Sequence, residues 1–132
     1  MKAVESRGSE IEKRMFEALS TKEIGDLEHH ADDLPGTPDF VHRQARVAVF
    51  IDSCYWHGCP DHFSMPESNR EYWKRKIHDN KERDREVTSQ LESSGWLVKR
   101  IWGHSVKSQK SRRWWATRIE TIINERRPGR EG

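Results

Sequence analysis

The sequence has few apolar residues and no long run of them. Of its 132 residues, 33% are hydrophobic and 35% are charged. No stretch approaches the ~18 apolar residues of a membrane-spanning helix. The N-terminus, MKAVESRGSEIEKR, contains no apolar signal region. The sequence therefore predicts a soluble, cytoplasmic protein with no membrane segment.

So low an apolar content is close to that of chains that do not fold unaided. The six tryptophans argue against disorder, because disordered chains contain few large aromatic side chains. A chain of this length should form one domain and bury roughly two thirds of its unfolded surface. We expect a single domain over residues 1–125 and a disordered C-terminal tail over residues 126–132.

The formal net charge is only +2, but the charges are unevenly distributed. Residues 1–40 carry ten acidic and five basic side chains, whereas residues 99–118 carry seven basic side chains and no acidic one. A basic stretch interleaved with aromatic residues is typical of a surface that binds a polyanion such as nucleic acid. A solvated Lys/Arg face on a terminal helix would give the same pattern, and the segment alone does not decide between the two.

The pattern of apolar and turn residues predicts an α/β (α+β) domain with a small mixed sheet. Ser9 and Glu12 form a capping box, which predicts a helix that begins there and ends near Leu19. The expected later elements are a turn over 34–38, a hairpin of strands 39–41 and 46–51 with a polar tip over 42–45, a helix over 65–94, a strand over 96–102 and a helix from about 111.

Both cysteines lie in one short segment, DSCYWHGCPDHF, over residues 52–63. Two thiolates and an imidazole at the spacing of Cys54, Cys59 and His62 favour a zinc ion, with His104 as the fourth ligand after the third strand. A structural zinc would also add folding free energy that the sparse apolar core lacks. A Cys54–Cys59 disulfide and two buried free thiols are the alternatives.

Acidic residues at the ends of the hairpin strands form a second group. Asp39 opens one strand and Asp52 closes its neighbour, so both carboxylates and the Ile51 carbonyl should lie at one edge. Such hard oxygen ligands suit Mg²⁺, which supports phosphodiester hydrolysis. Asp84 lies on the apolar stripe of the long helix, where an acidic residue is costly unless it is paired or functional.

Two further residues are open to both a functional and a structural interpretation. The capping box alone accounts for Glu12. His57, among aromatic residues and outside the proposed zinc ligands, is a candidate general acid or base. A lone histidine is more often structural.

These motifs resemble the very-short-patch repair (Vsr) DNA mismatch endonucleases. The resemblance rests on DLPGTPDF (33–40), VFIDSCYWHGC (49–59), YW (72–73), NKERD (80–84) and the segment from GWLV (95–98) to Trp102, with weaker matches at residues 1–4 and 11–14. It covers roughly residues 1–105 in unbroken order.

The resemblance implies a restriction-endonuclease-like, PD-(D/E)xK-related fold with a structural Zn²⁺, and Mg²⁺-dependent nicking 5′ to the T of a T:G mismatch. Asp39 and the Ile51 carbonyl match the family's metal ligands. His57, Asp84 and Glu12 match residues of the hydrolytic centre. Tyr55, Trp56 and Trp73 match aromatic residues that wedge into the DNA beside the mismatch.

The resemblance also implies double-stranded, mismatched DNA as the substrate and a functionally linked cytosine-5 methyltransferase, with a monomer sufficient for a single nick. Asp52 stands where well-studied members carry a second histidine. The alternatives are a related nicking nuclease of restriction or defence without a T:G requirement, and a catalytically silent zinc domain that binds DNA.

Overall fold

The structure, a computed structural model, describes residues 2–52 and 67–127, with side chains from Glu10 onwards. Its elements in chain order are α1 (Lys2–Ser20), β1 (Glu28–His29), β2 (Phe40–His42), β3 (Val47–Asp52), α2 (Arg70–Ser93), β4 (Leu97–Trp102), the 3₁₀ helix η1 (Gly103–Val106) and α3 (Gln109–Arg126). None of the described helices is long and apolar enough to cross a membrane.

A four-stranded mixed sheet in the order β1-β2-β3-β4 forms the centre of the domain. The pairs β1–β2 and β2–β3 are antiparallel, whereas β4 runs parallel to β3, with Asp52 opposite Trp102. A parallel pair needs a long crossover, and α2 lies within it. The predicted hairpin and small mixed sheet are therefore confirmed.

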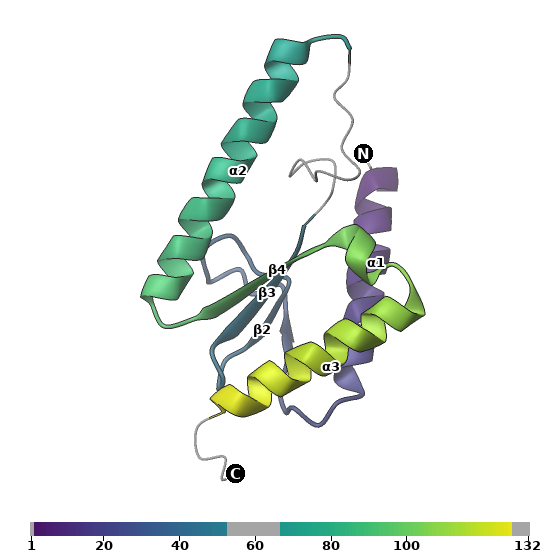
Figure 1. The fold of residues 1–132 in the computed structure, drawn as a ribbon, viewed down its shortest axis with the longest axis vertical. Helices are drawn as coiled ribbons and strands as arrows, with labels where there is room; N and C mark the ends of the chain where they lie inside the picture. Colours follow the sequence, from purple (N-terminus) through teal and green to yellow (C-terminus); the bar gives the residue numbers. More distant parts are fainter. Residues whose placement is uncertain (1, 53–66, 128–132) are drawn as a thin grey trace.

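Helices cover both faces of this sheet, with α1 and α3 on one side and α2 on the other (Figure 1). Alternate residues of β3 supply the two cores, because successive side chains of a strand point to opposite faces. Val47 and Val49 pack with Met15, Leu19 and the isoleucines of α3, whereas Ala48 and Phe50 pack with Leu91 of α2. The two small cores account for the low apolar content.

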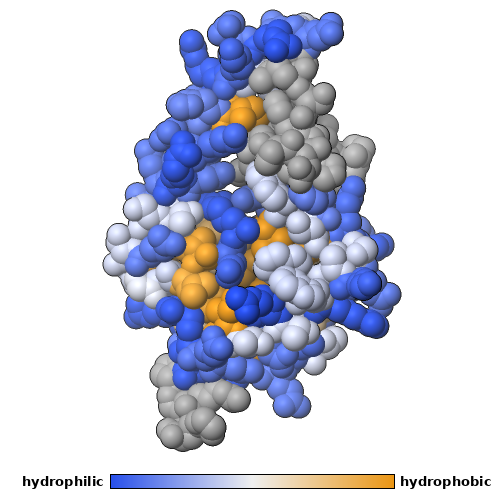
Figure 2. Space-filling model, viewed as in Figure 1, coloured by the Kyte–Doolittle hydropathy of each residue, from blue (hydrophilic) through white to orange (hydrophobic). Residues whose placement is uncertain are grey.

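Polar residues occupy the outside of this three-layer arrangement. Figure 2 shows hydrophilic residues over most of one face of the molecule, with apolar residues gathered near its middle. The predicted apolar stripe of the long helix is confirmed, since Ile77 and Leu91 are buried and Val87 packs against the core cluster that contains Leu91. The closing helix begins earlier than predicted, at Gln109, with the Ser108 side chain accepting a hydrogen bond from the Ser111 amide.

The predicted start of the first helix is wrong. The helix α1 already begins at Lys2, so Ser9 lies inside it and is not its N-cap. A capping side chain satisfies backbone amides that have no partner at the start of a helix. Because residues 2–8 are already helical, the amides that follow donate to carbonyls one turn earlier and leave none for Ser9 to cap. Glu12 is therefore an interior residue of α1, and capping no longer accounts for it.

The hairpin tip also differs from the prediction, because His42 and Ala45 are buried and not part of a polar tip. The His42 ring donates through Nε2 to the Ile24 carbonyl and accepts from the Ala45 amide at 3.1 Å. This histidine thus ties the loop before β1 to the hairpin.

The short strand β1 was not predicted, since it lies in a polar stretch with no apolar alternation. The predicted disorder of the tail stays a prediction, since residues 128–132 lie outside the described residues.

We expect Gly36→Ala to destabilise the fold strongly. Gly36 has a φ of +74°, and a Cβ there would lie 2.6 Å from Cγ1 of Val87 in α2. Left-handed strain and overpacking together should lower the free energy of unfolding by roughly 2–4 kcal/mol, measured by urea denaturation.

Gly25→Ala is the matched control, because Gly25 has a φ of +86° but its Cβ would meet only the His42 ring at 3.8 Å. Gly25→Ala should therefore cost only the backbone strain. Equal losses for the two variants would contradict the packing of the turn against α2.

Candidate active site

Asp39 is held directly before the start of β2 by the turn that precedes it. The Thr37 amide donates to the Leu34 carbonyl at 3.1 Å, and the Ala31 amide donates to the Pro38 carbonyl at 3.1 Å. The amide of Ile51, in the neighbouring strand β3, donates to Asp39 Oδ2 at 2.7 Å. The carboxylate is thus fixed against the two strands, beside the Ile51 backbone.

Two histidines and a glutamate surround Asp39. Glu12 reaches from α1 to the end of β1, where His30 Nε2 donates to Glu12 Oε1 at 2.9 Å. The His30 Nε2 atom also lies 3.7 Å from Asp39 Oδ1, and His29 Nε2 lies 3.7 Å from Glu12 Oε1. The structure therefore brings together two predicted residues, Glu12 and Asp39, with two that were not predicted.

Aromatic stacking fixes the His29 ring. Phe16, one turn after Glu12 in α1, stacks on His29 with ring centroids 5.1 Å apart, and Phe40 of β2 stacks on it at 5.3 Å. The ring of His30 stacks on His29 at 4.0 Å. Burial and the neighbouring His30 lower the pKa of His29, which favours its neutral imidazole near neutral pH.

The environment of Asp39 opposes its ionisation. Burial, together with the nearby Glu12 carboxylate, raises the pKa of Asp39 to about 7, against the opposing hydrogen bond from the Ile51 amide. Two carboxylates held together at the end of a sheet form an environment in which a bound cation would relieve their repulsion.

Asp52 and Asp84 converge on Arg100 of β4. Arg100 Nη1 lies 3.0 Å from Asp52 Oδ1 and 3.7 Å from Asp84 Oδ1, and its Nε donates to Thr88 Oγ1 at 2.9 Å. The guanidinium also lies over the Phe50 ring, 4.1 Å from its centroid. Arg100 therefore links α2 to β3 and β4, and the catalytic roles of Asp52 and Asp84 stay predictions.

Most of the predicted zinc and DNA-binding residues lie outside the described residues, namely Cys54, Tyr55, Trp56, His57, Cys59 and His62. His104 lies in η1, two residues after Trp102. Since Trp102 pairs with Asp52, the chain leaves both parallel strands at the same edge of the sheet. Trp73, the third predicted wedge, lies in the first turn of α2 with its ring edge against Tyr72.

The site residues that sequence reasoning missed are His29, His30 and Arg100. The adjacent histidine pair, in a polar stretch without periodicity, was a signal that could have been noticed. Arg100 was counted with the basic surface over 99–118, but only 21% of its side chain is exposed, and it serves an internal ion pair. No local pattern distinguishes such an arginine from a solvated one.

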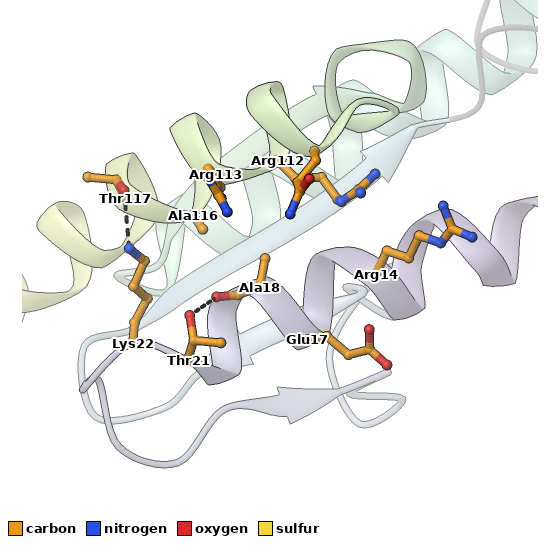
Figure 3. Close-up of a pocket in the computed structure, with 10 residues that line it drawn as sticks. Arg14, Glu17, Ala18, Thr21, Lys22, Arg112, Arg113, Ala116 and Thr117 are labelled. Carbon is orange, nitrogen blue, oxygen red and sulfur yellow. Dashed lines mark hydrogen bonds between the residues drawn. The ribbon is translucent and has the colours of Figure 1, made fainter.

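A basic cavity of about 670 Å³ lies between α1 and α3 (Figure 3). Its cationic lining residues are Arg14, Lys22, Arg112 and Arg113, with Glu17 as the acidic one. Lys22 donates to Thr117 across the cavity at 3.2 Å. Next to it, exposed Trp114 lies among Lys110, Arg113 and Arg118. This part of the basic stretch is therefore at the surface, as predicted.

Comparison with known proteins identifies several relatives. Residues 1–62 match the family described as DNA mismatch endonuclease Vsr. The chain is 34% identical over 111 residues to the DNA mismatch endonuclease Vsr of Escherichia coli, covering 83% of this chain and 70% of that protein.

Two further relatives are described as type II nicking enzymes. The chain is 48% identical over 73 residues to V.NaeI of Lentzea aerocolonigenes, covering 55% of this chain but only 44% of that protein. It is 36% identical over 104 residues to V.XorIIP of Xanthomonas oryzae pv. oryzae, covering 77% of this chain and 75% of that protein.

The raised pKa of Asp39 predicts a pH-dependent stability. Because the folded state binds this proton more tightly than the unfolded state, the contribution of Asp39 is complete below about pH 4 and is lost as the pH rises through about 7. Without added divalent cations, the stability of Asp39→Asn relative to the parent should rise with pH up to about pH 7, with a slope approaching about 1.4 kcal/mol per pH unit.

Urea denaturation of both proteins between about pH 5 and pH 8 measures this difference, in which the titrating groups away from Asp39 cancel. A difference that stays constant with pH would contradict the burial of Asp39 against Glu12.

Asp52→Asn should destabilise the fold by about 2 kcal/mol or more, because it leaves the largely buried Arg100 cation without its nearest counter-charge. Glu82→Gln, which breaks the exposed Arg85–Glu82 pair, is the control and should have no measurable effect. Thermal and urea unfolding compare them, and equal effects would show that Arg100 does not depend on Asp52.

Proposed function

The chain belongs to the Vsr DNA mismatch endonuclease family, and we propose that it nicks one strand of DNA 5′ to the T of a T:G mismatch, with Mg²⁺ as cofactor. The observation that carries this proposal is the convergence of Asp39, Glu12 and His30 at the end of the sheet. Membership of the family makes DNA the expected substrate, and the mismatch requirement is the finer part of the proposal.

The described residues fit a divalent cation at Asp39. Its carboxylate is oriented by the Ile51 amide and faces a second carboxylate, whose repulsion a cation would remove. Asp39 and the Ile51 carbonyl would hold Mg²⁺, with Asp52 as a further predicted ligand. When bound, the ion would polarise the scissile phosphate and lower the pKa of a coordinated water.

The other residues of the proposed centre position groups or move protons. Glu12 accepts a hydrogen bond from His30 beside Asp39 and would position a water or the cation there. His57 is proposed as the general acid or base. Arg100 holds Asp52 and Asp84, so that these two carboxylates would act from fixed positions.

The mixed sheet with helices on both faces is compatible with a restriction-endonuclease-like, PD-(D/E)xK-related fold. We propose a structural Zn²⁺ held by Cys54, Cys59, His62 and His104. The pairing of Asp52 with Trp102 supports this ligand set. In the sequence, Cys54 comes two residues after Asp52 and His104 comes two residues after Trp102.

DNA binding would combine aromatic wedges with phosphate contacts. Tyr55, Trp56 and Trp73 are proposed to enter the base stack, which is easier where pairing is already poor. The exposed cations of α1 and α3 around the cavity of Figure 3 would contact phosphates, and affinity would then fall steeply with salt. A monomer acting with a linked cytosine-5 methyltransferase completes the proposal, since deaminated 5-methylcytosine creates T:G.

A second candidate is a nicking enzyme that does not require a T:G mismatch. It is favoured by the relatives described as type II nicking enzymes, one of which is 48% identical to this chain. The two candidates share the same centre and differ only in the substrate they accept.

Labelled duplexes that differ only in T:G or T:A, each in at least two flanking contexts, test the proposal. We expect Mg²⁺-dependent nicking of the T-containing strand of the T:G duplex only. Asp39→Ala should lower the nicking rate at least about 100-fold, because it removes a metal ligand. Asp26→Ala, at an exposed position, should nick like the parent.

Equal nicking of T:A and T:G would favour the second candidate. A parent chain that binds DNA but nicks neither duplex would show a catalytically silent domain. Full activity of Asp39→Ala would overturn the assignment of the metal centre.

A further inference from the structure

Three side chains beside Asp39 direct their ligand atoms to one point. The Nε2 atoms of His29 and His30 both face Oε1 of Glu12, at 3.7 Å and 2.9 Å. The three ligand atoms all lie within 4.8 Å of one another. A simple ion pair needs one imidazole, whereas here two imidazoles face the same carboxylate oxygen.

These spacings are close to those of ligands on one metal ion. Two atoms bound at about 2.1 Å, with an angle of about 90–110° at the ion, lie about 3.0–3.4 Å apart. The contacts of Glu12 with the two histidines bracket this range. Half of the His30 side chain is exposed, so this ring can turn by the small amount needed and solvent can complete the coordination.

The site is ordered before any ion binds. The His29 ring is held in the stack of Phe16 and Phe40. The His30 amide donates to the Asp39 carbonyl at 2.9 Å, which extends the β1–β2 pairing by one residue. Glu12 is carried by α1, which Met15 and Leu19 anchor in the core. Binding therefore requires little ordering of the chain.

The donor set selects the kind of ion. Two imidazoles and one carboxylate, with open positions, form the set found in His₂Glu zinc sites and in related transition-metal sites, whereas Mg²⁺ prefers oxygen ligands and retains its water.

We propose that Glu12, His29 and His30 form a binding site for a zinc-like divalent transition ion, distinct from the Mg²⁺ site at Asp39 and from the zinc site at the cysteines. Its existence does not depend on the nicking activity. Its use in catalysis rests on the proposed function, in which it would place a second cation beside Asp39.

Calorimetric titration with Ni²⁺ of untagged protein that carries one equivalent of Zn²⁺ tests this site, because the four-ligand cysteine site takes up that zinc first and imidazole ligands suit Ni²⁺. We expect the parent to bind one Ni²⁺ at this site. His29→Gln, His30→Gln and Glu12→Gln should each weaken that binding by about tenfold or more. The affinity for Mg²⁺ should change little in His29→Gln.

His78→Gln is the matched control, because His78 is an exposed histidine of α2, away from this group. It should bind Ni²⁺ like the parent, and thermal unfolding shows whether each variant is folded. The proposal is overturned if the folded His29→Gln and His30→Gln variants bind Ni²⁺ like the parent, or if all variants lose the same affinity as His78→Gln. Because the readout is binding, a failure to nick T:G would leave it standing.

Discussion

The hydrogen bond from the Ile51 amide to Asp39 joins the chemistry of this protein to its sheet. It fixes a carboxylate at the junction of β2 and β3, where burial opposes its charge. Glu12 and His30 reach this carboxylate through the same sheet. The helix α1, which carries Glu12, packs on one face of the sheet, and the backbone amide of His30 donates to the Asp39 carbonyl. A buried carboxylate facing another is tolerable only where protons, imidazoles or cations balance the charge, and the site offers all three possibilities.

The sheet connects two groups of charged residues, and the sequence places acidic residues in both. Glu12 and Asp39 meet histidines, whose charge depends on pH, whereas Asp52 and Asp84 meet Arg100, which is always charged. The first group can therefore change its protonation or bind a cation, while the second acts as a permanent ionic link between α2 and the sheet. This difference is the physical reason to place the adaptable chemistry around Asp39.

Much of the fold was predictable from local patterns. The hairpin, the long helix with Ile77 and Leu91 on its buried face, the strand after Gly95 and the closing helix all follow from periodicity and turn residues. The errors have local causes too. Ser9 and Glu12 match a capping box inside a longer helix, and β1 has two polar residues whose pairing partner lies beyond the next turn. Of the site, Asp39 was predictable from its position after a turn, whereas Glu12 depended on the family resemblance.

The sequence by itself determined the family, the helices and strands with strong periodicity, and the turn that presents Asp39, because these depend on residues close together in the chain. Only the tertiary structure decided which side chains meet. His30 joins Glu12 across 18 positions of sequence, and Arg100 joins Asp52 across 48. Such contacts depend on how the elements pair and pack, and a polar residue in a loop or strand carries no local mark of its distant partner. The metal chemistry of Glu12, His29 and His30 is therefore a property of the folded chain.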